Sequence, residues 1–387
     1  MAAQKLGQKF APGEKGGIPP SKQDQKIDLR IAHWCNWAPR ISGMYETTRE
    51  LIEAENRIEG VLAGFCETPG LGAAPQRIKK AAEGGRVDPM HVHFRSQDWG
   101  WAMKFADIHV IHATKLGRVG ELKPRAFFIH GTVEACLGNE LEPQDRNASF
   151  SSAGGYIAKS AATFVTNERS RLFWSQFDYS GERVHRVNKG IDLEWWKRTP
   201  TTQDLTGEPS VLYGEVWRGI KHPLHLLYAV SQLYQENPEI RLNLWGCNVK
   251  RSFWQGMIKA LRFDEFLGRP GLGNIIDYPE HYYTRGDVLV SPGIYGNVTR
   301  VHQEAMACGC PVIAWDTDPF QDTHPYKYAK AFDITDLGQK IMDASNDVLD
   351  DREGVAQQCR SIAEKYFDIN LEAQQIVSVL RDVVSAQ

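Results

Sequence analysis

A chain of 387 residues is long enough for two domains of ordinary size, each with its own hydrophobic core. Apolar residues make up 42% of the sequence but form no run long enough to cross a bilayer, which argues against an integral membrane protein. The formal net charge of -3 gives no overall attraction to nucleic acid or to an anionic membrane.

The first half of the chain alternates between predicted strands and helices. Residues 1–26, rich in Lys, Gln, Gly and Pro, lack periodicity and are typical of a flexible tail. A helix is predicted from about Tyr45 to Ile58, and a helix followed by a strand over 156–167. Strands alternating with helices predict a parallel sheet covered on both faces. The other predicted strands are 29–34, 61–65, 91–94, 107–113 and 125–131.

The second half repeats the same alternation after a link over 184–196 and a polar run. Residues 210–235 indicate strand, turn and helix, and the stretch 349–384 is predicted to be helical. The two halves therefore predict two α/β domains of similar architecture. The remaining predictions are strands at 241–247, 287–292 and 311–315, with a strand and turn over 274–283.

The segment 285–319 is the most informative in the chain. An apolar run, Val288–Val290, stops at a loop that contains Gly296 and Asn297, and Thr299 can cap a helix that runs to Cys308. Such a loop offers backbone N–H groups and a helix dipole to an anion. Glu304, one or two turns into the helix, is within reach of a hydroxyl on the same ligand. A phosphate at the loop and a ribose or sugar at the carboxylate together suggest a nucleotide-sugar.

The residues of this helix carry a family resemblance. Glu304–Val312, with the sequence EAMACGCPV, resembles the donor-binding signature of the GT-B retaining glycosyltransferases of family 4. The leading glutamate of that signature, usually assigned to the donor sugar, is replaced here by Gly296. Asn188, Gly190 and Asp192 match the link that this family has between its two domains.

The resemblance implies an α/β protein of the GT-B fold, with two Rossmann-like domains whose parallel sheets face an interdomain cleft. An acceptor-binding domain would cover 27–205, and a nucleotide-sugar-binding domain would cover 206–365. A helix over 366–387 would then pack back toward the first domain.

The resemblance also implies the donor contacts. The segment Gly214–Lys221 resembles the family's Gly-Arg…Lys-Gly stretch, in which the cations hold the diphosphate. Glu215 stands in the place of the arginine, so Arg218 is expected to supply the second charge beside Lys221. Fixed cations stabilise the charge that grows on the β-phosphate, and neither a metal nor a cofactor is expected. The complete set of predicted donor contacts is Gly43, Gly214, Gly246, Cys247, Gly296, Asn297, Val298, Thr299, Arg300 and Glu304, the last for the ribose hydroxyls.

The acceptor side is predicted from the first domain. His130 follows a predicted strand and precedes a glycine, where family 4 enzymes commonly place a histidine near the reacting sugar. A neutral imidazole there can accept a hydroxyl proton or hold the sugar. Trp34, Trp37 and Arg40 crowd the first strand-to-helix loop, where aromatic faces can stack on an acceptor. His109 and His112 alternate with apolar residues and are expected to satisfy local hydrogen bonds.

The expected activity is retaining transfer of a hexose from a UDP- or GDP-sugar to a hydroxyl acceptor. The acceptor stays open between a glycan, a lipid, a small molecule and a hydroxymethylated base in phage-type DNA. Ten Lys or Arg against five acids over 77–125 are compatible with DNA. A non-enzyme alternative is an inactive nucleotide-sugar-binding partner subunit, because Gly296 and Glu215 replace two usual donor contacts.

The cysteines indicate a reducing compartment. Seven of them are scattered along the chain without a disulfide-like spacing, which fits the cytoplasm, or the host cytoplasm if the protein is viral. Cys308 and Cys310 are expected at a buried helix-to-strand corner rather than at a zinc ion.

Overall fold

A computed structural model describes residues 26–35, 43–67, 93–94, 106–112, 124–131, 154–155, 157–200, 205–217, 221–246, 256, 258–268, 278–294 and 298–387. The chain divides into two compact units. It passes from the first unit to the second between Gly190 and Ile191, and it returns to the first unit between Asp368 and Ile369. The first unit therefore contains the first half of the chain together with the last helix. The tail expected over 1–26 lies, apart from Lys26, outside the described residues.

The first unit contains a seven-stranded parallel sheet in the order β3-β2-β1-β4-β5-β6-β7. Every residue of β4, β5 and β6 is buried, as expected for parallel strands covered on both faces. The strands are β1 (Leu29–Cys35), β2 (Val61–Glu67), β3 (His93–Phe94), β4 (Ile108–Ile111), β5 (Arg125–Ile129), β6 (Ala162–Val165) and β7 (Val184–Arg186).

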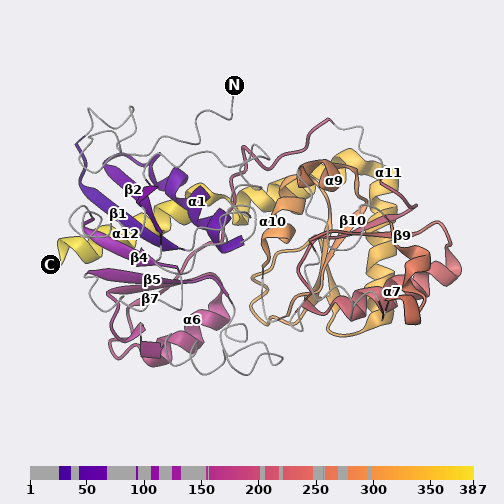
Figure 1. Ribbon diagram of the computed structural model, residues 1–387, viewed down its shortest axis with the longest axis horizontal. Helices are drawn as coiled ribbons and strands as arrows, with labels where there is room; N and C mark the ends of the chain where they lie inside the picture. Colours follow the sequence, from indigo (N-terminus) through magenta and orange to yellow (C-terminus); the bar gives the residue numbers. More distant parts are fainter. Residues whose placement is uncertain are drawn as a thin grey trace. The chain divides into compact units, whose positions relative to one another are not determined.

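Helices lie on both faces of this sheet. On one face, α1 (Gly43–Glu55) and α12 (Ile369–Ser385) pack together over apolar residues of β1, β2 and β4 (Figure 1). On the other face, α6 (Glu168–Trp174) and the short 3-10 helix η6 (Ser175–Phe177) enclose a second core around Trp34 and Trp174. Asn167 caps α6 by accepting the backbone N–H of Ser170 at 2.7 Å, which starts the helix directly after β6.

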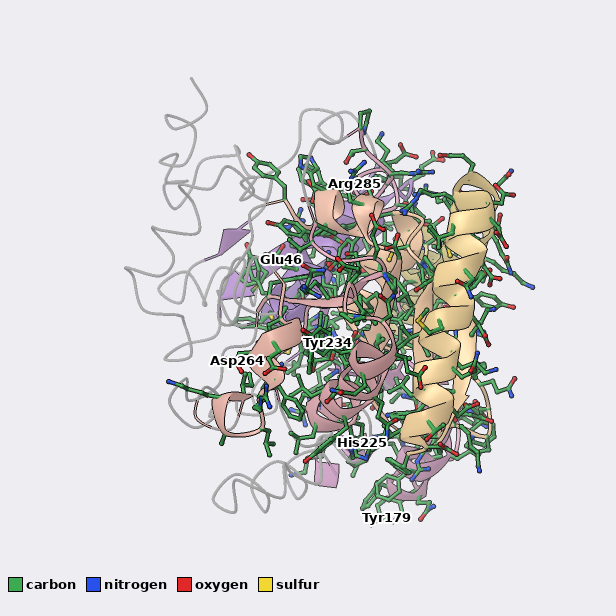
Figure 2. The ribbon with its side chains drawn as sticks, turned by 90° about the vertical axis from the view of Figure 1, so that its right-hand side faces the viewer. Glu46, Tyr179, His225, Tyr234, Asp264 and Arg285 are labelled. Atoms are coloured by element: carbon green, nitrogen blue, oxygen red, sulfur yellow. The ribbon has the colours of Figure 1, made fainter. Side chains whose placement is uncertain are left out.

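The second unit has a five-stranded parallel sheet in the order β12-β11-β10-β8-β9. A core on one face includes α7 (Pro223–Glu236), on which Figure 2 labels His225 and Tyr234. The opposite core includes α9 (Pro279–Arg285) and α10 (Arg300–Ala307). The strands are β8 (Ser210–Tyr213), β9 (Arg241–Leu244), β10 (Val288–Ser291), β11 (Val312–Asp316) and β12 (Lys327–Lys330), and a 3-10 helix, η8, covers Phe263–Phe266.

The long helix α11 (Ile334–Tyr366) joins the two cores of the second unit. Asp351 has φ -150° and ψ 78°, so the helix is interrupted there. Residues before the interruption, such as Leu337 and Ile341, pack in the α7 core, and residues after it, such as Cys359, pack in the α10 core. One continuous segment therefore helps to close both faces of the sheet.

The α/β class with two parallel sheets is confirmed. The strand and turn expected over 274–283 are wrong for 279–283, where α9 begins at Pro279, because a proline is favoured in the first turn of a helix; residues 274–277 lie outside the described residues. The stretch 349–384 is helical as predicted but belongs to two helices, α11 and α12, separated at Phe367 and Asp368. Among the described helices, none has the length and apolar character that crossing a membrane requires.

Candidate functional site

The amino end of α10 is organised by Thr299. Its hydroxyl oxygen accepts the backbone N–H of His302 at 3.2 Å, which confirms the predicted helix cap. The same hydroxyl donates to Glu215 Oε1 at 2.6 Å. The start of α10 is thereby tied to the segment that follows β8.

Glu215 is the buried centre of this cluster. Its carboxylate also accepts the Ser291 hydroxyl at 3.0 Å and pairs with Lys221 Nζ at 3.0 Å. Burial raises the pKa of Glu215, but Lys221 and the hydroxyls of Thr299 and Ser291 outweigh burial and leave the pKa below its usual range. Glu215 is therefore ionised at neutral pH and holds the Lys221 ammonium beside the ends of β8 and β10 and the start of α10.

Glu304 is also buried, and two of its contacts are described. Arg300 Nε lies 2.9 Å from Oε1, and the Tyr283 hydroxyl donates to Oε2 at 3.0 Å. The Arg300 guanidinium lies 5.8 Å from the ring centre of Trp196. An ionised carboxylate has about four acceptor positions, so a glutamate is a residue type that can accept a ligand hydroxyl as well as protein donors.

Two of the predicted glycines bring the ends of β8 and β9 together around Trp245. A Cβ atom on Gly214 would lie 2.5 Å from Trp245 Nε1, so only glycine permits this contact. Gly246 has φ +68°, in the left-handed region that favours glycine. Of the other predicted contacts, Gly43 is the first residue of α1 and Val298 is buried in the α10 core.

His130 lies in the first unit, directly after β5, and is partly exposed. Its Nε2 lies 2.6 Å from Nδ1 of His112, and Nε2 of His112 lies 2.8 Å from Nδ1 of His33. Nε2 of His33 lies 2.6 Å from Glu55 Oε2. His112 therefore satisfies hydrogen bonds as expected, but with partners distant in sequence, His33 in β1 and His130 after β5.

Burial lowers the pKa of three histidines in this region, so their imidazoles are neutral at pH 7. Burial lowers the pKa of His130 to about 3, with Lys189 and His33 adding to the effect. Burial also lowers the pKa of His112 well below its usual value and that of His109 to about 4. Neutral His130 has the lone pair needed to accept a hydrogen bond from a hydroxyl.

Trp34 corrects an expectation. Its side chain is only 2% exposed and lies in the core beneath α6, and its indole N–H donates to Nδ1 of His109 at 3.1 Å. The alternation of β1 turns this residue toward the sheet face opposite His33. Trp34 therefore packs the core and does not offer its ring to an acceptor.

Comparison with known proteins shows what this chain is similar to. Residues 210–347 match the family model described as glycosyl transferases group 1. The structure resembles Anabaena HepE in complex with UDP-glucose, with a TM-score of 0.66 and 17% identity over 92% of this chain and 100% of that one. The chain has the GT-B fold, and its residues 210–347 are similar to the glycosyl transferases group 1 family.

Two further proteins are similar to this GT-B chain. Sucrose-phosphate synthase from Thermosynechococcus elongatus superposes with a TM-score of 0.66 and 16% identity, over 93% of this chain and 100% of that one. D-inositol 3-phosphate glycosyltransferase 2 of Catenulispora acidiphila is 24% identical over 257 residues, or 62% of this chain. That match spans 57% of the length of the inositol phosphate enzyme.

Several predicted contacts in the first and second units are not placed. The residues concerned, all outside the described ranges, are Trp37, Arg40, Arg218, Cys247, Gly296 and Asn297. The donor and acceptor roles given to them stay predictions, as does the expectation that no metal or cofactor is needed. The buried corner predicted for Cys308 and Cys310 is confirmed, with both side chains at most 1% exposed.

Sequence reasoning missed three partners in these sites. The sequence gives no sign that Tyr283 contacts Glu304, because its segment is expected to be a strand and turn. The i, i+4 spacing of Arg300 and Glu304 does indicate that the acid has a cationic neighbour. Glu55 and His33 gave no signal beyond a histidine in an apolar strand and an acid at a helix end. Their contact joins different elements, which a single sequence does not show.

Proposed function

We propose that this GT-B protein is a retaining hexosyltransferase that uses a nucleotide diphosphate sugar as donor and a hydroxyl group as acceptor. The observation that carries the proposal is the arrangement at the start of α10, where Glu215 joins Lys221 to the helix cap Thr299 and the same helix carries Glu304, all within the family-matched segment. These are the residue types that a diphosphate and a ribose require. The bound UDP-glucose of the HepE structure supports a UDP-sugar as the first donor to test.

Donor chemistry follows from the charges around α10. The helix start offers backbone N–H groups and the positive end of its dipole to a diphosphate. Lys221, held in place by Glu215, adds a fixed cation. As the glycosidic bond to the diphosphate breaks, negative charge grows on the β-phosphate, and preorganised positive groups stabilise it. Glu304 accepts the ribose hydroxyls.

On the acceptor side, His130 supplies a neutral imidazole at the end of β5. It orients the acceptor hydroxyl and accepts its proton as the new bond forms. The five described cysteines, Cys35, Cys66, Cys308, Cys310 and Cys359, are free and buried, which supports a reducing cytoplasm as the place of action.

The test is turnover by the purified chain. UDP- and GDP-sugars are incubated with a library of glycans, lipids, small polyols and hydroxymethylated DNA duplex, and products are identified by mass spectrometry. A hexose added to a hydroxyl, with the anomer assigned by NMR, supports the proposal. If every donor and acceptor pair leaves the library unmodified, while the protein is folded, the proposed activity is wrong.

Two variants assign the activity to the cluster. Glu304→Gln removes a charged acceptor and should weaken nucleotide-sugar binding about tenfold. Lys221→Ala should lower the turnover rate about 100-fold because it removes charge stabilisation of the leaving diphosphate. Glu364→Gln is the matched control, because it removes an i, i+4 arginine–glutamate pair of α11 at a side chain that is 56% exposed. Unchanged donor affinity in the first variant and unchanged rate in the second would move the donor site elsewhere.

One observation favours a second candidate, an inactive nucleotide-sugar-binding subunit. Glu215 already neutralises Lys221, so this cation is less available to a leaving group than an unpaired one. UDP binding measured by calorimetry, with no turnover on any acceptor, would favour this candidate. The DNA acceptor is tested in the same library. The salt dependence of turnover identifies it, because an enzyme that acts on DNA loses activity steeply as salt rises.

A further inference from the structure

A cavity of about 1010 Å³ lies at the amino edge of the second sheet. The amino ends of β8 and β10, the end of α9, the segment 198–200 and the middle of α11 line it, and all of them belong to the second unit. Sites for small molecules in proteins have volumes of roughly 300–1,000 Å³, so this cavity has room for a ligand. We call it the amino-edge cavity.

The amino-edge cavity is separate from the cluster around Glu215. Ser210 begins β8 and Asp287 directly precedes β10, whereas Glu215 and Ser291 lie at or beyond the carboxyl ends of the same strands. A strand rises about 3.3 Å per residue, so four residues of strand separate the two places by about 13 Å. A ligand in the amino-edge cavity is therefore not the donor proposed for the start of α10.

Three arginines line the amino-edge cavity. One of them, Arg285, is the last residue of α9 and is exposed (labelled in Figure 2). Within the described part of the chain, its guanidinium makes no hydrogen bond and no ion pair. A guanidinium carries five N–H donors and is not deprotonated in proteins. The cavity therefore contains a permanent cation that no described side chain neutralises.

The other two arginines are held in place but keep donors to spare. Arg198 Nη1 lies 2.6 Å from Oε2 of Glu353, whose side chain is 83% exposed. Arg352 pairs with Asp287 and donates to the carbonyl oxygen of Gly286 at 3.3 Å. Neither guanidinium uses all five donors in these contacts. Exposed ion pairs are weak, so Arg198 can exchange Glu353 for an anionic ligand.

The interruption of α11 explains the position of Arg352. Asp351 Oδ1 accepts the backbone N–H of Gly354 at 2.9 Å, which is the bond of a helix cap, so the second part of the helix begins at Arg352. Asp287, the partner of Arg352, accepts the backbone N–H of Ser210 at 2.7 Å with its other oxygen. The Arg352 guanidinium is thereby fixed to the amino ends of β8 and β10. Such a cation is ordered before any ligand arrives, which lowers the entropic cost of binding.

The remaining polar groups of the lining indicate what else a ligand needs. Two acids, Asp287 and Glu353, are already paired with arginines. The exposed carboxylate of Glu208 has no hydrogen bond or ion pair among the described residues, and neither has the exposed amide of Asn346 on α11. An unpaired carboxylate accepts from hydroxyl groups and repels a ligand that carries nothing but negative charge. The free groups therefore match one anionic group and several hydroxyls on the same molecule.

We propose that the amino-edge cavity binds a phosphorylated polyol. Its phosphate contacts the guanidinium of Arg285 first and those of Arg198 and Arg352 in addition. Its hydroxyls contact Glu208 and Asn346. A phosphomonoester has three terminal oxygens that can accept from more than one guanidinium, whereas a carboxylate has two. The ligand is distinct from the sugar donor, and its binding does not depend on transferase activity.

The first test is isothermal titration calorimetry of the full chain at pH 7.5. The four probes are sorbitol phosphate, inorganic phosphate, sorbitol and gluconate. We expect sorbitol phosphate to bind about tenfold more tightly than the other three, because it alone satisfies the cations and the free carboxylate together. Tighter binding of gluconate would overturn the phosphate assignment. No heat of binding with sorbitol phosphate up to about 10 mM would overturn the site.

A variant of Arg285 locates the ligand. Arg285→Gln removes an exposed charge and none of the described contacts, so the variant should fold. We expect its affinity for sorbitol phosphate to fall about tenfold. Arg262→Gln is the matched control, because it removes an exposed arginine of the same unit that does not line the cavity, and its affinity should stay within about twofold. Equal affinity of Arg285→Gln and wild type would overturn the proposal.

A variant of Glu208 tests the hydroxyl contact. Glu208→Gln replaces the unpaired carboxylate by a neutral amide of similar size. We expect it to weaken sorbitol phosphate about fivefold, while inorganic phosphate, which has no polyol chain, binds no more weakly. If both probes change equally, or neither changes, the polyol part of the proposal is wrong.

UDP separates this site from the proposed donor site. We expect the Kd for sorbitol phosphate to stay within about twofold in saturating UDP, and the Kd for UDP to be unchanged in Arg285→Gln. Displacement of sorbitol phosphate by UDP would place the phosphate in the donor cluster and overturn the proposal. A chain that binds no UDP would count against the proposed function alone, and the comparison of Arg285→Gln with wild type would still decide the amino-edge cavity.

Discussion

Glu372 provides a stability prediction with a defined magnitude. This residue of α12 is fully buried, and Oε2 accepts the backbone N–H of Gly190 at 2.6 Å. Its Oε1 has no hydrogen-bond partner among the described residues. Burial raises the pKa of Glu372 from 4.5 to about 8, although Gly190 and Lys189 oppose the change. At pH 7 the folded protein therefore holds a proton that the unfolded chain has released.

The sign follows from linkage. A carboxyl whose folded pKa is raised contributes its full stability below pH 4.5 and loses it as the pH rises toward 8. At about 1.4 kcal/mol per pH unit, the folded state loses about 3 kcal/mol between pH 4.5 and pH 7. Glu372→Gln has no such proton to lose. Its free energy of unfolding, relative to wild type, should rise by about 3 kcal/mol over that interval.

The measurement is guanidinium denaturation at several pH values, followed by pulsed hydrogen exchange of β1 and β4 peptides so that the first unit is scored separately. Histidine titration is common to both proteins and cancels in the difference. Asp382→Asn, at an exposed position of the same helix, is the matched control and should show no pH-dependent gain. A difference between Glu372→Gln and wild type that stays constant from pH 4.5 to 7 would refute the reasoning.

Three further predictions concern the two sites. Gly214→Ala places a methyl group against the Trp245 ring and should cost about 2 kcal/mol of stability with a shifted tryptophan emission; unchanged emission and midpoint would contradict it. Thr299→Val removes the α10 cap and a buried hydroxyl bond and should lower the free energy of unfolding by about 2 kcal/mol, whereas Thr299→Ser should stay near wild type. Equal stability of the two variants would show that the hydroxyl is unimportant. Lowering the pH from 6.5 to 5 should lower the free energy of unfolding by about 2 kcal/mol through His130 alone. The reason is that the pKa of His130 is about 3 in the folded protein, so over this range the ring is protonated in the unfolded chain but not in the folded one. His130→Gln should flatten that acid limb in a denaturation series, and an unchanged slope would place the titration elsewhere.

Local patterns predicted much of the fold. The apolar runs of β1, β5, β8 and β10 identified buried parallel strands, and the threonine before α10 identified the start of that helix. These signals are readable because each lies within a few consecutive residues, where periodicity and capping act. The segment at Pro279 shows the limit of the method, since seven residues hold too few turns for a helical period to stand out.

Contacts between distant elements could not be predicted in the same way. Glu215 reaches Ser291 and Thr299 across 76 and 84 positions of sequence, and His33 reaches His112 across 79. Nothing in the local pattern around a buried acid or histidine says which strand will lie beside it. From the sequence, Glu215 is interpreted as the loss of a donor contact. In the structure it pairs with Lys221 and accepts the hydroxyl of the helix cap Thr299.

The placement of α12 has a consequence for synthesis on the ribosome. Five of its side chains, Ile369, Ala373, Ile376, Val377 and Leu380, belong to the same core as β1 and α1. That core stays incomplete while the whole second unit is translated, because α12 follows it in the chain. In most multidomain proteins the first domain can finish folding before the next is synthesised. Here the first unit can complete its core only after the second unit has been synthesised. The nascent first unit must keep an apolar surface covered until α12 leaves the exit tunnel.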